Sequence, residues 1–273
     1  MTRRHTYRPV ASRALAPAAT VAAFIAAVGA SVASEPTTPA NPTSETDMSQ
    51  TTDEQSAPLK RELDDLRERF NDRADDHTKR VYDAGVAAVK ASGIEQTAKQ
   101  VGDKAPQFIL PDAVGNEVSL DELLAEGPVV LTWYRGGWCP YCNIQLRAYQ
   151  QILPQIRSLG ASLAAVSPET PDNSLDTAQK NELEFAVLSD KGHTVASKFG
   201  LTYTLESDVA EIYSKHFDLL AFNGDDSNQL PVSATYVIDQ DRTIRFAFID
   251  ADYRNRAEPS DVVEALRSIA TEQ

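Results

Sequence analysis

The sequence has very little cysteine: a chain of 273 residues contains two, Cys139 and Cys142. A fold held together by disulfides needs several pairs, so that class of small secreted domain is excluded. Basic residues are also few: the sequence has 26 Lys and Arg against 40 Asp and Glu, which gives a net charge of -14. This balance argues against nucleic-acid or anionic-membrane binding, which need clustered Lys and Arg. The hydrophobic content of 42% is enough for a core without covalent staples.

The sequence also lacks a long hydrophobic run. The clearest apolar stretch, LAPAATVAAFIAAVGA, is short and rich in alanine, so it does not predict a membrane span. It lies within residues 1–34, after four arginines, with no acidic residue, and before the small-residue stretch SVAS. Basic, then apolar, then small residues are the layout of a secretory signal peptide. We therefore expect export to the periplasm or cell envelope if Met1 is the start.

A second start site is available at Met48. Translation from Met48 would give a cytoplasmic protein without the signal segment. Residues 35–57 are rich in Pro, Thr, Ser and acidic residues, which predicts a disordered linker under either start.

An amphipathic helix is predicted from Leu59 towards Gly93, as part of a helical extension over residues 58–100. Apolar residues recur at spacings of four and three, Pro58 suits the first turn, and Gly93 suits the end. We expect this helix to pack on its own domain, with the seam of a homodimer as the alternative.

The main domain is predicted over residues 101–273. Strands are expected at 129–134, 161–167, 185–190, 234–239 and 243–250, and helices at 139–157, 171–182 and 259–270. The segment 206–229 is expected to be an inserted helix and loop. Strands that alternate with helices and end in a hairpin and a helix predict an α/β sandwich.

The two cysteines stand between an expected strand and an expected helix. Pro140 fits the first helical position, which places Cys139 at the N-cap and Cys142 one turn into the helix. The N–H groups of a first helical turn and the helix dipole favour a thiolate at the cap, so Cys139 is the expected nucleophile. Cys142 lies on the same helical face, within bridging distance.

Other interpretations of the pair remain open. One alternative is half of a zinc site that His193 and His216 would complete, although a second cysteine pair is missing. A structural disulfide is another alternative, but so short a loop gives little stabilisation. Two buried small residues would not need the Gly136–Gly137 turn and Pro140 at an element boundary. A redox pair is favoured over all three.

From Val101 to the C-terminus the chain resembles the AhpC/TSA peroxiredoxin-like proteins of the thioredoxin-like superfamily. The matching pieces are GDKAPQFILPD, Gly115, SLDELL, VVLTWYRGGWCPYC, ATYVID and TIRFAFID. The resemblance implies a thioredoxin-like α/β/α sandwich with a central mixed sheet. It implies reduction of hydroperoxides without a metal or other cofactor, with Cys139 as the peroxidatic cysteine that is oxidised to a sulfenic acid. Cys142 would resolve it to a disulfide, and a thioredoxin-like dithiol would reduce the disulfide.

The chain departs from the family pattern at two positions. Gly136 stands where the family has Thr or Ser, and residues 231–233 lack the usual Arg. Arg135 is therefore the candidate for holding a peroxide oxyanion. Trp138 and Tyr141 flank the thiol and are expected to shield it and to form a docking surface.

Two other functions are compatible with these residues. A thiol–disulfide oxidoreductase could use the same pair on protein disulfides, and an export signal would favour that activity. A redox-inactive binding module could keep the fold, in which case replacing Cys139 would change nothing.

Overall fold

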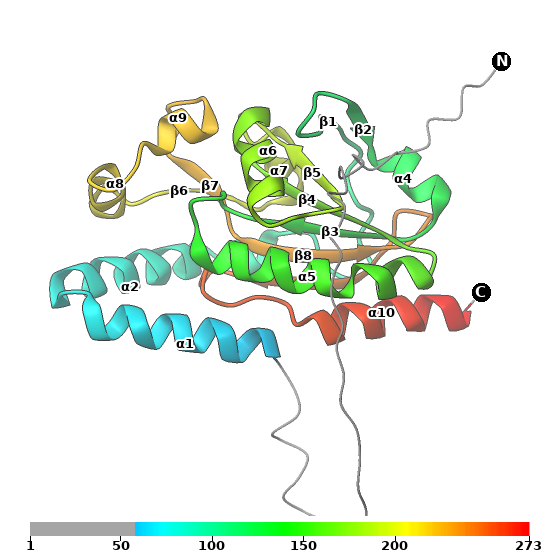
Figure 1. The fold of residues 1–273 in the computed structure, drawn as a ribbon, viewed down its shortest axis with the longest axis horizontal. Coiled ribbons are helices and arrows are strands. Elements are labelled where there is room, and N and C mark those ends of the chain that lie inside the picture. Colours follow the sequence, from blue (N-terminus) through cyan, green and yellow to red (C-terminus); the bar gives the residue numbers. More distant parts are fainter. Residues whose placement is uncertain (1–57, 273) are drawn as a thin grey trace, which may run out of the picture. The chain divides into compact units, whose positions relative to one another are not determined.

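A computed structural model describes residues 58–272 (Figure 1). The predicted signal peptide (1–34), the linker (35–57) and the alternative start at Met48 lie outside the described residues. No helix within 58–272 is long and apolar enough to cross a membrane.

The centre of the fold is a five-stranded mixed sheet in the order β5-β4-β3-β8-β9. β3 pairs in parallel with β4 and antiparallel with β8, β4 pairs in parallel with β5, and β8 pairs antiparallel with β9. All five strands predicted from the sequence are present. Their bounds are β3 Val129–Trp133, β4 Ser162–Ser167, β5 Ala186–Ser189, β8 Ser233–Ile238 and β9 Ile244–Asp250.

Helices cover both faces of this sheet. One face packs against α1 Pro58–Arg73, α5 Pro140–Ser158 and α10 Pro259–Glu272. The other face packs against α3 Ile94–Thr97, α4 Leu120–Glu126 and α7 Thr194–Phe199. α6 Pro171–Lys180 lies beside β5. A small hairpin, β1 Ile109–Pro111 with β2 Glu117–Ser119, completes the second layer. The mixed sheet between two helical layers confirms the predicted α/β/α architecture.

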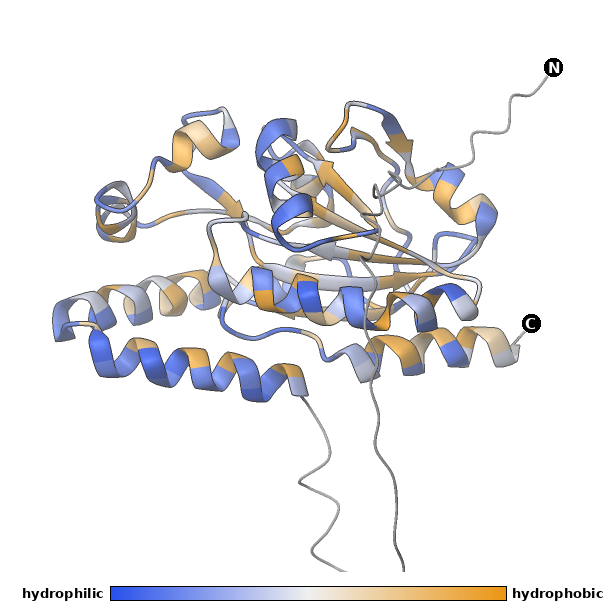
Figure 2. Cartoon of the chain, in the orientation of Figure 1, coloured by the Kyte–Doolittle hydropathy of each residue, from blue (hydrophilic) through white to orange (hydrophobic). Residues whose placement is uncertain are grey.

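Strand β3 determines where the cysteines lie. All five of its residues are buried, because Val130 faces α5 while Leu131 and Trp133 face the opposite layer. A strand covered on both sides reads as a continuous apolar run, and the central strands are mostly in the hydrophobic colours in Figure 2. Two threonines, Thr132 on β3 and Thr235 on β8, bond to each other and to Gln145, which fastens α5 to the sheet.

The strand register brings three loops to one edge of the sheet. Trp133, at the end of β3, pairs with Ala234, and Ser233 pairs with Asp250 at the end of β9. β4 runs parallel to β3 and therefore ends at the same edge. The loops that follow β3, β4 and β9 thus meet beside the N-terminus of α5.

The predicted single N-terminal helix is wrong, because the segment forms two helices, α1 and α2 Asp76–Ala91. Asp75 adopts an extended backbone and caps α2, accepting a bond from the Thr78 N–H at 3.0 Å. Such a side-chain cap competes with continuation of the helix. α1 buries Leu59 and Leu63 in the core, and its remaining surface is mostly hydrophilic (Figure 2).

The inserted segment is more ordered than the predicted helix and loop. It contains α8 Ser207–Ser214 and α9 Leu219–Asn223, and β6 Thr202–Thr204 pairs with β7 Gln229–Pro231. α8 packs on α2 at Gly85, where a Cβ would lie 2.8 Å from the Val209 Cγ2. The insertion therefore has its own small apolar cluster, made of Leu205, Val209, Tyr213, Leu219 and Leu230.

We expect His193 to make the fold sensitive to acid. It is 1% exposed, and neither ring nitrogen has a hydrogen-bond partner. Burial lowers the pKa of His193 below 6.5, although Asp225 and Asp190 oppose this shift. The unfolded chain then binds more protons, so stability is complete above pH 6.5 and falls as the pH drops below it, by at most about 1.4 kcal/mol per pH unit.

Urea denaturation of the wild type and of His193→Asn between pH 7.5 and 5.5 measures this effect. Asn suits the left-handed backbone at this position, where φ is 58°. The variant should lose less stability on acidification than the wild type. Equal losses would show that His193 does not contribute.

Candidate active site

The cysteine pair lies where the sequence predicts it, at the start of α5. Cys139 is the N-cap residue and Pro140 occupies the first helical position. Both cysteines are free, with exposures of 1% for Cys139 and 0% for Cys142. The Cys139 side chain makes no capping hydrogen bond, however, so the donors expected at its sulfur are not used there.

The Cys142 sulfur receives the donors instead. Arg256 Nη2 donates to Cys142 Sγ at 3.1 Å, and the backbone N–H of Arg135 donates at 3.5 Å. Arg256 is 7% exposed, and its Nη1 donates to the carbonyl oxygens of Tyr253 and Asn255. These two carbonyls fix the guanidinium, so a positive charge is held against one sulfur of the pair.

These contacts favour ionisation of Cys142 over Cys139. Burial opposes ionisation of Cys142, but the Cys139 thiol, the charges of Arg256 and Arg135 and the Arg135 N–H outweigh it and hold the pKa of Cys142 well below its usual value. Burial, together with the Cys142 sulfur, raises the pKa of Cys139 well above its usual value. The sequence predicts the thiolate on Cys139, whereas the structure places the cationic and backbone donors at Cys142, which favours a thiolate on Cys142 in the reduced pair.

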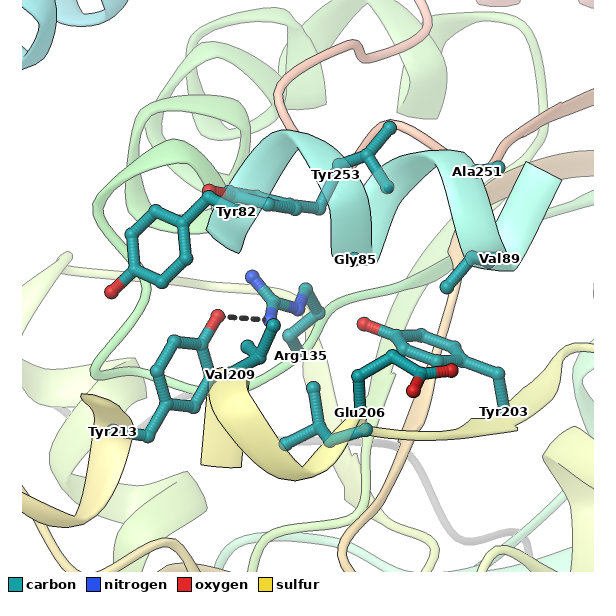
Figure 3. Close-up of a pocket in the computed structure, with 12 residues that line it drawn as sticks. Tyr82, Gly85, Val89, Arg135, Tyr203, Glu206, Val209, Tyr213, Ala251 and Tyr253 are labelled. Carbon is teal, nitrogen blue, oxygen red and sulfur yellow. Dashed lines mark hydrogen bonds between the residues drawn. The ribbon is translucent and has the colours of Figure 1, made fainter. Parts of the chain in front are cut away.

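Arg135 lies inside the protein beside a narrow pocket (Figure 3). It is 2% exposed, its Nη2 donates to the Tyr213 hydroxyl, and its Nε has no partner. Its Cζ lies 4.2 Å from the ring centroid of Tyr253 and 5.0 Å from that of Trp138. Aromatic faces stabilise a buried cation in part. The guanidinium thus keeps an unused donor near a space of about 20 Å³, enough for one small polar group.

The two aromatic residues of the motif have different surroundings. Trp138 is half-buried and stacks on Phe217 of the insertion, with ring centroids 4.7 Å apart. It therefore joins the cysteine turn to residues 202–231. Tyr141 is 6% exposed and packs edge-on against Tyr253, so it lies in the core and does not offer the expected docking surface.

A buried carboxyl group underlies the glycine turn. Glu169, in the loop after β4, is fully buried, and its Oε1 accepts a hydrogen bond from the Gly137 N–H at 3.0 Å. Gly137 has no room for a side chain, since a Cβ would lie 2.0 Å from the Thr177 hydroxyl oxygen. Burial raises the pKa of Glu169 to about 7. The Arg256 guanidinium thus contacts the Cys142 sulfur of this turn, and the titratable carboxyl group of Glu169 accepts a hydrogen bond from its backbone.

Sequence reasoning missed Arg256 and Glu169. Neither belongs to the cysteine motif, and each reaches the turn only through the fold. A signal was nevertheless available in the strand order: residues just after a strand that ends beside β3 must lie at the same sheet edge. Arg256 follows β9 and Glu169 follows β4.

The zinc-site alternative is not formed within residues 58–272. No group of three or more His, Cys, Asp or Glu side chains in that part of the chain is arranged to hold a metal ion. His193 lies at the start of α7, where its ring is buried.

Comparison with known proteins gives several relatives. Peroxiredoxin Bcp of Escherichia coli (strain K12) is 29% identical over 102 residues, which are 37% of this chain and 65% of that protein. The chloroplastic peroxiredoxin Q of Gentiana triflora is 26% identical over 163 residues, 60% of this chain and 63% of that protein. The match thus spans slightly less than two thirds of each relative's length.

Solved structures show the same fold. The peroxidoxin BcpB of Mycobacterium tuberculosis superimposes with a TM-score of 0.50 at 24% identity, over 62% of this chain and 97% of that one. A mutant of the peroxiredoxin 6 of Arenicola marina gives a TM-score of 0.51 at 16% identity, over 64% and 76% of the two chains. The family model described as "AhpC/TSA family" matches residues 101–247, more than half of the sequence. The chain therefore belongs to the AhpC/TSA family.

Proposed function

We propose that this protein is a thiol peroxidase in which Cys142 attacks the hydroperoxide. The observation that carries the proposal is the 3.1 Å contact from Arg256 Nη2 to Cys142 Sγ, which supplies a thiolate in a buried site. In the first step, Cys142–S⁻ + ROOH + H⁺ gives Cys142–SOH + ROH. In the second, Cys139–SH + Cys142–SOH gives the disulfide and water. The order of the two cysteines is thus the reverse of the one that the sequence suggested.

Arg135 is the proposed partner of the peroxide. The Arg135 guanidinium lies beside the pocket, and its Nε has no hydrogen-bond partner. The backbone N–H of Arg135 donates to the Cys142 sulfur. A positive donor placed where negative charge develops stabilises the departing oxygen. The names of the relatives, peroxiredoxins Bcp and Q, support the same activity.

A thioredoxin-like dithiol is the proposed reductant of the disulfide. Export of the chain through residues 1–34, or a cytoplasmic location after a start at Met48, remains a proposal from the sequence alone. The formation of a homodimer is likewise a proposal from the sequence alone.

A thiol–disulfide oxidoreductase is the second candidate, favoured by the CxxC spacing. With exposures of 1% and 0% at the two sulfurs, a protein disulfide can touch the attacking sulfur only after the turn opens, and a dithiol reductant has the same requirement. A small peroxide needs much less room.

The test is a stopped-flow titration of the reduced protein with hydrogen peroxide and with an organic hydroperoxide. Tryptophan fluorescence follows the reaction, since Trp138 adjoins the cysteine turn. We expect oxidation at least about a hundred times faster than that of a free thiol, ending in a Cys139–Cys142 disulfide. Oxidation at the rate of a free thiol, with fast exchange against a protein disulfide, would favour the second candidate.

A further inference from the structure

The loop at residues 251–258, between β9 and α10, carries the arginine that contacts Cys142. Arg256 Nη1 donates to the carbonyl oxygens of Tyr253 and Asn255. Arg256 Nη2 donates to Cys142 Sγ at 3.1 Å. The carbonyl groups that hold the guanidinium therefore belong to the backbone of the same loop. Because the attraction between a cation and a thiolate weakens with distance, its strength depends on how firmly this loop is held.

The N-terminal helix α1 contacts this loop at two points. Arg67 Nη2 donates to Asn255 Oδ1 at 3.0 Å. The backbone N–H of Lys60 donates to Glu258 Oε1 at 2.6 Å. Lys60 and Arg67 lie on the same side of α1, since they are about two helical turns apart, and Figure 1 shows the loop passing along α1 before α10 begins. Arg256 thus lies between two loop residues that α1 holds.

Helix α1 is itself fixed to the layer that contains the cysteines. Leu59 and Leu63 are 2% and 4% exposed, and they belong to the same apolar cluster as Cys139 and Cys142. α1 also packs against α5, the helix that begins at the cysteine pair. It is therefore a fixed support for the loop. Both α1 and residues 251–258 lie outside residues 101–247, which the family model matches.

Arg67 makes the contact that a substitution can test. Its side chain is 33% exposed, and its Nη2 also lies 3.7 Å from the Asp252 carboxylate, which is 19% exposed. The Lys60 contact uses the backbone and survives a change of side chain. A further ion pair joins Arg254 of the loop to Asp83 on α2, but Asp83 is 65% exposed, and exposed ion pairs contribute little. The expected support thus comes mainly from α1.

We propose that Arg67 is a positioning residue for the thiolate of Cys142. By holding Asn255, Arg67 keeps the loop against α1. The loop in turn keeps the Arg256 guanidinium against the Cys142 sulfur, so Arg67 acts through Arg256 and touches no reacting atom. A helix outside the family match thereby contributes to the reactivity of the cysteine. The inference rests on the proposed thiolate at Cys142.

Titration of the thiolate absorbance tests this inference without any peroxide. The Cys139→Ser parent is used, because Cys142 is then the one remaining sulfur of the pair. We expect Arg67→Ala to raise the pH midpoint of thiolate formation by about 0.5 to 1 unit, since the loop and its guanidinium are held less firmly. Arg69→Ala is the matched control and should titrate as the parent does, because Arg69 is an exposed arginine of the same helix.

A double-mutant cycle separates positioning from a direct effect of the Arg67 charge. If Arg67 acts through Arg256, adding Arg67→Ala to Arg256→Gln should move the midpoint by less than about 0.2 unit. Shifts that add would overturn the inference, and so would an Arg67→Ala midpoint equal to that of the parent. Urea denaturation shows whether Arg67→Ala is folded. Asn255→Ala removes the same hydrogen bond from the other side and should give the same shift.

The titration also distinguishes failure of this inference from failure of the proposed function. A parent midpoint at the ordinary thiol value, unchanged by Arg256→Gln, would remove the Cys142 thiolate and the inference with it. A low parent midpoint that rises in Arg256→Gln but not in Arg67→Ala or Asn255→Ala would remove the role of Arg67 alone.

Discussion

Cys142→Ser is expected to lower the rate constant for reaction with hydrogen peroxide by at least about a thousandfold, because it removes the attacking thiolate. Cys139→Ser should leave the first oxidation within about tenfold of the wild-type rate, since the Arg256 contact with Cys142 is unchanged. The sulfenic acid would then persist for lack of a resolving thiol. Stopped-flow fluorescence gives the rates, and mass spectrometry after dimedone labelling identifies the oxidised cysteine.

The two single variants are each other's control. They differ by one sulfur at two buried positions three residues apart, so general damage to the turn should affect both. A fast Cys142→Ser together with an inert Cys139→Ser would reverse the assigned order. Comparable slow rates in both, with native circular dichroism, would remove peroxide reduction from the protein's functions.

Arg256→Gln is expected to slow peroxide oxidation at pH 7 by about 10- to 100-fold. Glutamine keeps a hydrogen-bond donor near the Cys142 sulfur but removes the charge that lowers the pKa of Cys142. The thiolate is the reactive form, so the fraction of reactive protein falls as that pKa rises towards the working pH. The deficit should therefore shrink at higher pH, where the thiol ionises without help.

The pKa of Cys142 can be followed directly by thiolate absorbance near 240 nm in a Cys139→Ser background, where one cysteine remains. Arg254→Gln is the matched control, two residues away. Arg254 pairs with Asp83 at 2.9 Å and with Asp252 at 2.7 Å, and its charge should not set the pKa of the sulfur. Equal titration curves for Arg256→Gln and its parent would show that this guanidinium does not stabilise the thiolate.

Much of the fold followed from local sequence pattern. The apolar run at 129–134 and the hairpin at 234–250 are strands because their periodicity and turn residues act over a few neighbours. Pro140 likewise places Cys139 at the N-cap of α5. The break at Asp75 was missed because a heptad-like stripe continues across it, and one side-chain cap decides the outcome locally.

The chemistry of the site depends on contacts that are remote in the sequence. Arg256 reaches Cys142 across 114 positions, and Glu169 reaches Gly137 across 32. Local pattern favoured the first cysteine because the N-cap position alone supports a thiolate. The thiolate of the second cysteine, Cys142, is stabilised by the Arg256 guanidinium, which belongs to the loop after β9. Only the strand register links these segments.

The burial of the Cys139 and Cys142 sulfurs has a consequence for the reduction of their disulfide. A protein dithiol cannot touch sulfurs that are 1% and 0% exposed while the turn stays folded. Reductive turnover then depends on a local opening equilibrium, whose free energy includes breaking the stack of Trp138 on Phe217. We expect that weakening that stack speeds the reduction of the disulfide and leaves its formation unchanged, so that the insertion would control recycling of the proposed peroxidase.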